Sequence, residues 1–145
     1  MQTPPAGKPS GCISELDKER LLALIERTFT GGRSLDAAAS TVLHRLRNSG
    51  VIAKPDLIPP GLVTMNSTIR LCAEDGNRVQ EVTLVYPEDH DPAESCWSVL
   101  STLGATLFGL GVGDVVEIPD ADGSIARWRI DAIPFQPEAR GFLTM

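Results

Sequence analysis

Apolar residues recur at helical spacing between residues 14 and 29. The residues of this pattern, which are separated by Asp, Glu, Lys and Arg, are Leu21, Leu22, Leu24, Ile25 and Phe29. Positions three and four residues apart share one face of an α-helix, so the segment predicts an amphipathic helix. Ser14 is a suitable N-cap residue, and Asp17, three positions later, fits the capping pattern.

A second helical pattern follows the short sequence TGGRS at residues 30–34. Its apolar face consists of Leu35, Ala38, Ala39, Val42 and Leu46. Ser34 can cap this helix, and Gly50 can end it. Two helices of similar length with so short a connection are predicted to be antiparallel neighbours, forming a helical hairpin about 20 Å long. Arg33 lies at the tip of this hairpin.

The period of the apolar pattern changes after residues 53–61, a segment with three prolines and a glycine. Such a segment neither continues a helix nor fits a central strand, so it predicts a junction between two parts of the chain. Alternating patterns at 68–72 and 82–86 flank the turn sequence Asp75-Gly76-Asn77 and predict a β-hairpin. Further strands are expected at 96–100, 114–119 and 125–133.

The last of these strands, IARWRIDAI, has a clear alternation of apolar and charged residues. Trp128, Ile130 and Ala132 are expected to face the core, while the charged residues between them face outward. Pro134 follows and lacks a backbone N–H for the ladder, so we expect the strand to end there or to lie at an edge of the sheet.

Four glycines fall within GATLFGLGVGD, residues 104–114. A Walker loop needs Lys and then Ser or Thr after its second glycine, and Leu110 and Gly111 occupy those positions. A dinucleotide-binding loop places its glycines between a strand and the start of a helix. Here a short helical pattern follows Ser101, and the glycines come at its end. We therefore predict a helix exit, and an α+β fold in which five antiparallel strands wrap one short helix.

Charge is distributed unevenly along the chain. Residues 1–60 contain eight Lys and Arg against six Asp and Glu, whereas residues 61–145 contain five against thirteen. The acidic second half disfavours direct nucleic-acid binding, which draws most of its affinity from Lys and Arg, and it favours a basic protein surface as partner. The alternative is that the acidity only aids solubility.

Composition and cysteine spacing limit the classes of protein to which the chain can belong. With 145 residues, 42% of them hydrophobic, the chain suits a globular fold, and no apolar run approaches the roughly 20 residues that span a bilayer. Residues 1–13 lack the apolar core of a secretory signal and are expected to be a disordered lead-in. Cys12, Cys72 and Cys96 are odd in number and far apart, which indicates a reducing cytoplasm.

One loop concentrates metal-ligating residue types: Glu88, Asp89, His90, Asp91 and Glu94. Carboxylates and imidazole are common ligands, so a metal site is one interpretation. A solvated acidic loop is the other, because adjacent loop residues point in different directions and no second His or Cys lies at a ligand spacing. No nucleophile with an activating base is identified, so we predict no catalytic residue, metal or cofactor.

Four segments carry a family resemblance: VTMNSTIRL at 63–71, TLVYPEDHDP at 83–92, SVLSTLGATLFGLGVGDVVEI at 98–118 and FQPEARG at 135–141. They resemble the regulators of nucleoside diphosphate kinase (Rnk), bacterial relatives of the transcript-cleavage factors GreA and GreB. The resemblance covers residues 62–141 closely and the N-terminal hairpin only in layout. It implies an FKBP-like domain at 62–145, a short coiled coil at 14–52, and binding to RNA polymerase near its secondary channel.

Two departures from the cleavage factors bear on mechanism. Those factors carry acidic residues at the tip of a long coiled coil, where they help to hold a magnesium ion that requires carboxylate oxygens. The tip here carries Arg33, its nearest acid is Asp36, and the hairpin is shorter. The resemblance therefore implies a regulator that occupies the channel entrance in competition with Gre factors, without transcript cleavage.

The second departure lies in the loop implied to contact the polymerase. Rnk-like proteins usually keep a proline after Ser101, and Thr102 replaces it here. Proline at the first helical position pre-sets φ, so threonine is expected to leave the helix intact and the loop less rigid. Ser101 and Thr102 are the predicted contact residues.

Two other functions stay open. The FKBP-like resemblance suggests a peptidyl-prolyl isomerase, which needs an aromatic-lined apolar pocket; the aromatic residues of the second part include Trp97, Phe108 and Trp128, several of them expected in the core. The family name suggests direct regulation of nucleoside diphosphate kinase. We expect a cytoplasmic monomer that is not an enzyme, with no membrane association and no sequence-specific nucleic-acid binding.

Overall fold

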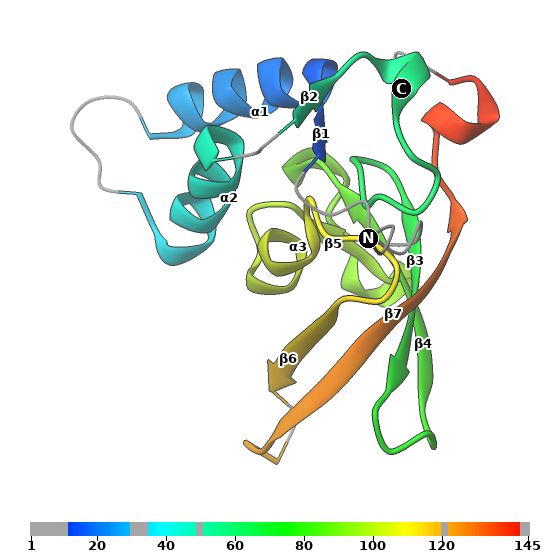
Figure 1. Ribbon diagram of the computed structural model, residues 1–145. Coiled ribbons are helices and arrows are strands. Elements are labelled where there is room, and N and C mark those ends of the chain that lie inside the picture. Colours follow the sequence, from blue (N-terminus) through cyan, green and yellow to red (C-terminus); the bar gives the residue numbers. More distant parts are fainter. Residues whose placement is uncertain (1–11, 30–34, 49–50, 120–121, 143–145) are drawn as a thin grey trace, which may run out of the picture.

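The structure is a computed structural model that describes residues 12–29, 35–48, 51–119 and 122–142. Its first part contains β1 (Cys12–Ser14), α1 (Glu15–Thr28), α2 (Ala37–Asn48) and β2 (Val51–Ala53). Its second part contains β3 (Thr68–Ala73), β4 (Val79–Val85), β5 (Cys96–Ser98), α3 (Thr102–Leu107), β6 (Val115–Pro119) and β7 (Ile125–Phe135). Figure 1 shows α3 beside α2, between that helix and β5. Within the described ranges, we find no helix with the length and apolar character that crossing a bilayer requires.

Helix α1 forms where the apolar pattern predicts it. Leu21, Leu24 and Ile25 are buried on one face, as expected for an amphipathic helix. Ser14 is the N-cap, and its hydroxyl accepts a hydrogen bond from the Asp17 N–H at 3.4 Å. The Asp17 carboxylate, however, does not contact the backbone of its own helix. It is buried and accepts a hydrogen bond from the Met65 N–H, in another part of the chain.

Helix α2 begins later than the sequence pattern predicts. Its first residue is Ala37, and the Asp36 carboxylate accepts a hydrogen bond from the Ala39 N–H at 2.8 Å. Asp36 therefore caps the helix in the way expected of an Asx residue. The predicted cap Ser34 and the predicted tip residue Arg33 lie outside the described residues.

The first residues of the described chain correct the predicted lead-in. Strand β1 pairs in parallel with β2, with Cys12 opposite Val51 and Ser14 opposite Ala53. Cys12 and Ile13 are buried, so these two residues of the predicted disordered segment 1–13 belong to the folded core. Three-residue strands are too short for an alternating pattern to reveal, which is why neither strand was expected.

The main sheet has the strand order β5-β4-β3-β7-β6. The β3–β4, β3–β7 and β6–β7 pairs are antiparallel, as predicted, but β5 runs parallel to β4. This corrects the expectation of five antiparallel strands. The chain between β4 and β5 forms two short 3₁₀ turns, Pro87–Asp89 and Pro92–Glu94, which bring it back to start β5 in the same direction as β4.

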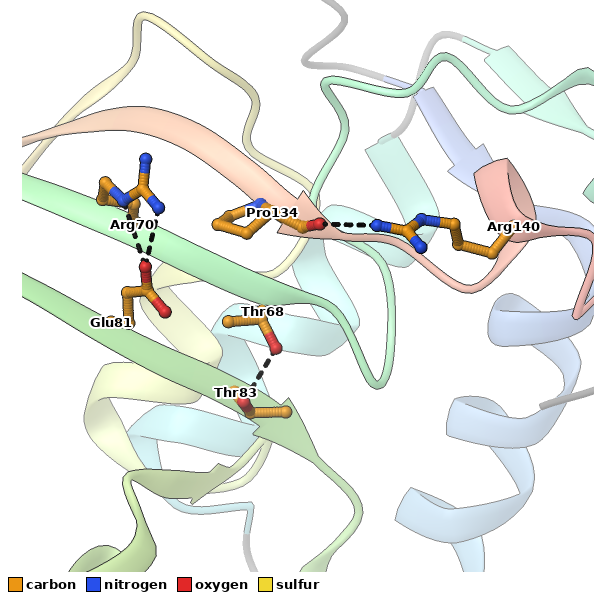
Figure 2. Close-up of polar contacts among 6 residues, drawn as sticks. All are labelled: Thr68, Arg70, Glu81, Thr83, Pro134 and Arg140. Carbon is orange, nitrogen blue, oxygen red and sulfur yellow. Dashed lines mark hydrogen bonds and ion pairs between the residues drawn. The ribbon is translucent and has the colours of Figure 1, made fainter.

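The predicted hairpin of β3 and β4 forms with Thr68 opposite Thr83. Figure 2 shows two cross-strand contacts along it: the threonine hydroxyls lie 3.1 Å apart, and the Arg70 guanidinium donates to one Glu81 oxygen at 2.9 and 3.1 Å. Such pairs on an exposed face add modestly to sheet stability and help to fix register.

Strand β7 confirms the predicted alternation at Trp128 and Ile130, which are buried between exposed residues, whereas Ala132, also predicted to face the core, is only half-buried. Pro134 is its next-to-last residue and lies in a register shift, because Ala132 pairs with Arg70 and Phe135 with Thr68. A bulge accommodates a residue without an N–H. Just beyond, the Arg140 side chain donates to the Pro134 carbonyl at 3.4 Å (Figure 2).

One hydrophobic cluster joins the helices to the sheet. It includes Leu21 and Ile25 of α1, Val42 and Leu46 of α2, and buried residues of β3, β4, α3 and β7. The two helices therefore bury their apolar faces against the rest of the protein. The predicted boundaries at 14–52 and 62–145, the coiled coil and the FKBP-like character stay predictions.

Candidate partner-binding site

The loop from β5 to α3 carries the predicted contact residues. Ser101 is the N-cap of α3, and its hydroxyl accepts from the Gly104 N–H at 3.1 Å while donating to the Ser98 carbonyl at 2.5 Å. The Leu100 N–H donates to the Ser98 hydroxyl at 3.0 Å. Ser101 is half-buried by these bonds, and Thr102 is exposed beside it. The two adjacent residues therefore differ in role: the Ser101 side chain forms hydrogen bonds that hold the loop, whereas Thr102 faces solvent.

The start of α3 lies directly against the end of β5. A Cβ atom at Gly104 would overlap the backbone carbonyl of Ser98, so only glycine permits this approach. Helix α3 begins at Thr102, which confirms that threonine at the first helical position leaves the helix intact. The loop is thus fixed by a helix cap and by close backbone packing.

The far end of α3 confirms the predicted helix exit. Gly109 and Gly113 have φ values of +81° and +97°, a left-handed conformation that glycine adopts without a steric penalty. The chain then enters β6 after Asp114, whose carboxylate accepts from the Gly111 N–H at 2.9 Å. These glycines turn the backbone from helix to strand.

A groove of about 380 Å³ lies beside the loop. Its apolar lining includes Trp97, Leu103 and Ile118, and its polar lining includes Ser101, Thr102 and Glu117. The structure therefore brings both predicted contact residues to the edge of one largely apolar groove, which is the arrangement expected where a protein partner docks.

His90, which the sequence suggested only as a candidate metal ligand, is a supporting residue of this site. Its Nδ1 accepts from the Ser98 N–H at 2.9 Å, and its ring meets the Trp97 ring edge-on with centroids 5.7 Å apart. His90 therefore holds β5 in place. Among the described residues, no group of three His, Cys, Asp or Glu side chains is arranged to hold a metal ion.

Asp17 is a second residue whose role the sequence pattern did not reveal. It is 2% exposed, and its carboxylate accepts from the Met65 N–H at 3.1 Å, joining α1 to the segment before β3. Burial raises the pKa of Asp17 to about 7, against the lowering effects of the Met65 hydrogen bond and the Arg20 charge. Burial and the charge of Asp17 in turn raise the pKa of Tyr86 to about 12.

Comparisons with known proteins agree with this architecture. The sequence profile of the family described as "Transcription elongation factor, GreA/GreB, C-term" matches residues 58–134. The regulator of nucleoside diphosphate kinase of Escherichia coli K12 is 31% identical over 134 residues, which are 92% of this chain and 96% of that protein. The transcription elongation factor GreA of Clostridium novyi is 29% identical over 98 residues, which are 68% of this chain and 58% of that protein.

Similarity to a solved structure extends over most of the chain. The prokaryotic transcription elongation factor GreA/GreB from Nitrosomonas europaea superposes with a TM-score of 0.75 and 35% identity, covering 86% of this chain and 98% of that one. The similarity includes the helical first part as well as the sheet, since such coverage exceeds the extent of the sheet alone. The chain therefore belongs to the family of regulators of nucleoside diphosphate kinase, relatives of the transcription elongation factors GreA and GreB.

Proposed function

We propose that this protein is a non-catalytic regulator of transcription that binds RNA polymerase at the entrance of the secondary channel and competes there with Gre-type factors. The observation that carries the proposal is the capped loop at Ser101 and Thr102, held at the edge of an apolar groove. A preformed loop binds with little loss of conformational entropy, so its order favours a role in recognition.

Charge around the groove supports a basic protein partner. Glu117 lines the groove itself. The exposed Glu88 and Asp89, in the loop between β4 and β5, line a separate hollow beside α1 and do not border this groove. Carboxylates at the rim of an apolar groove attract a positively charged surface and repel the phosphates of nucleic acid. We therefore place the partner contact on protein rather than on RNA or DNA.

The proposed absence of transcript cleavage depends on reach and on ligands. Helices of 14 and 12 residues are only about 20 Å long, and their apolar faces are buried in the shared core. The tip sequence TGGRS contains no carboxylate, whereas magnesium requires oxygen ligands of that kind. Addition of the protein to stalled elongation complexes with magnesium is expected to leave the RNA length unchanged.

The contact loop is tested by binding to core RNA polymerase. Thr102→Lys places a bulky cation at the exposed groove edge without removing any hydrogen bond of the Ser101 cap. We expect binding to weaken by about tenfold, because a bulky cation at a contact position obstructs the interface and repels a basic partner, and the ability to displace a Gre-type factor to fall in parallel.

A matched control introduces the same charge elsewhere. Gln80 is exposed on β4, and Gln80→Lys is expected to bind like the wild type. Equal affinity of the Thr102→Lys and wild-type proteins for polymerase would refute the contact loop, and an absence of wild-type binding would refute the proposed function.

The name of the Escherichia coli relative, "Regulator of nucleoside diphosphate kinase", favours nucleoside diphosphate kinase as a second candidate partner. Capture experiments with purified kinase and with purified polymerase separate the two candidates. Capture of the purified kinase by the wild type, with no capture of polymerase, would replace the first proposal by the second.

A further inference from the structure

Arg45 of α2 contacts the end of α3 that lies opposite the contact loop. One terminal nitrogen of its guanidinium lies within hydrogen-bond distance of three backbone carbonyls, those of Ala105 at 2.8 Å, Thr106 at 2.6 Å and Phe108 at 2.6 Å, which share its two N–H donors. These bonds connect residues about sixty positions apart in the sequence. They join the helical part of the chain to α3 directly.

The carbonyls at this end of α3 need a partner from outside the helix. In a regular helix the Gly109 N–H would donate to the Ala105 carbonyl, but it donates instead to the Val63 carbonyl at 3.2 Å. The last carbonyls of a helix are otherwise unsatisfied, and the usual glycine motifs bond them within the chain. Here Arg45 takes the place of that backbone cap.

Charge and packing agree with this role. A cation is favourable at a helix C-terminus because the peptide dipoles place partial negative charge there. Burial lowers the pKa of Arg45, while the nearby Asp114 opposes that shift. Val42 and Leu46, on the same helix, join the core cluster that contains Leu107 and Phe108, so the hydrogen bonds lie beside an apolar contact.

We infer that Arg45 is a positioning residue for the contact loop. Helix α3 has six residues, too few to be stable by itself, and it is held at both ends: by Arg45 at the C-terminus and by the Ser101 cap at the N-terminus. A helix fixed by α2 in this way keeps Ser101 and Thr102 oriented toward the groove. The inference rests on the proposed function for its consequence in polymerase binding.

The test compares three full-length variants. Arg45→Met keeps the length and apolar stem of the side chain but removes every donor. Arg45→Lys restores one nitrogen with three donors, which suits a site where a single nitrogen faces three carbonyls. Arg47→Met removes the same charge from an exposed position of the same helix and serves as the matched control.

Amide hydrogen exchange measures the order of the loop without any partner. The Leu100 and Gly104 amides report on it, because both donate to serine hydroxyls of the loop. We expect their exchange to be about tenfold faster in Arg45→Met, intermediate in Arg45→Lys and unchanged in Arg47→Met. The Glu74 amide, which donates to the Arg127 carbonyl in the sheet, is the internal reference and is expected to be unchanged.

Affinity for core RNA polymerase is measured on the same variants, and we expect about tenfold weaker binding for Arg45→Met with partial recovery in Arg45→Lys. Wild-type exchange at Leu100 and Gly104 in folded Arg45→Met would overturn the inference. If Arg45→Met does not fold, wild-type exchange in Arg45→Gln, whose shorter side chain cannot reach all three carbonyls, would overturn it. If loop exchange is faster in Arg45→Met but the wild-type protein does not bind polymerase, the proposed function is refuted and the role of Arg45 in ordering the loop still holds.

Discussion

The two long helices are joined to the rest of the protein by polar contacts of opposite charge. Helix α1 is joined through the Asp17 carboxylate, which accepts one hydrogen bond from the Met65 N–H. Helix α2 is joined through the Arg45 guanidinium, one nitrogen of which donates to backbone carbonyls at the C-terminal end of α3. Both contacts lie beside the same apolar cluster, yet they respond differently to pH.

The difference follows from the pKa of each group. Burial raises the pKa of Asp17 to about 7, so this contact changes its protonation state within the neutral range. An arginine side chain stays charged under all such conditions. The α1 contact is therefore sensitive to pH, whereas the α2 contact, at the end of α3 opposite the proposed binding loop, is not.

The largest effect is expected from the ionisation of Asp17. Its pKa is raised on folding from 3.8 to about 7, so the unfolded chain loses this proton at lower pH than the folded protein does. The free energy of unfolding is therefore expected to fall as pH rises from about 4 to about 7, then to level off, by roughly 4 kcal/mol at about 1.4 kcal/mol per pKa unit. Chemical denaturation at a series of pH values measures this change.

Asp17→Asn isolates that contribution, because the amide keeps an oxygen for the Met65 N–H and does not ionise. The variant and the wild type are expected to be similar at pH 4, and the variant more stable at pH 8. The groups that face Asp17, namely Glu138, Arg20 and Tyr86, remain in both proteins. If the free energy of unfolding varied with pH in the same way in both proteins, the raised pKa of the buried Asp17 carboxyl would be contradicted.

The next largest effect is expected at Gly104, on the α2 side of the comparison. Gly104→Ala forces α3 away from the Ser98 carbonyl that its new Cβ would overlap, and with it the carbonyls that Arg45 contacts. We expect the free energy of unfolding to fall by about 3 kcal/mol, the upper range for overpacking, together with loss of polymerase binding.

A control separates the clash from the loss of glycine itself. Gly76→Ala lies in a turn with φ +77° and open space around the new methyl group, so its destabilisation of about 1 kcal/mol comes from backbone conformation alone. If Gly104→Ala were no more destabilising than Gly76→Ala, the close packing of α3 on β5 would be wrong.

The smallest effect is expected from Thr102→Pro, which places proline at the first position of α3. Ser101 already has an extended backbone, with φ −82° and ψ 161°, which a following proline requires. We expect a gain of about 0.5–1 kcal/mol from the reduced freedom of the unfolded chain, and somewhat tighter polymerase binding. Thermal unfolding measures the gain, and a loss of stability would show that the Thr102 N–H has a structural role.

Much of the fold was predictable because its signals are local. The helical spacing of Leu21, Leu24 and Ile25, the alternation around Trp128 and Ile130, and the glycines after α3 each specify an element from neighbouring residues. The parallel direction of β5 was predicted wrongly, since the 3₁₀ turns that reverse the chain before it lack a clear sequence pattern. The start of α2 was also placed too early, because Ser34 and Asp36 are both good capping residues.

The candidate site was predicted only in part. The resemblance indicated Ser101 and Thr102, and the structure brings them to one groove. His90 was considered for metal binding, and instead it supports the backbone of β5. The sequence indicated only a capping role for Asp17 and no role for Arg45, because both positions look like ordinary solvated charges on amphipathic helices.

The sequence by itself determined where helices, strands and turns form, since helix periodicity, alternation, caps and left-handed glycines depend on residues a few positions apart. Only the tertiary structure decided which charged side chains are buried, because Asp17 and Arg45 meet their backbone partners 48 and about 60 residues away. A buried charge is stable only where a distant part of the chain supplies its hydrogen bonds, and that condition is not written in any single segment.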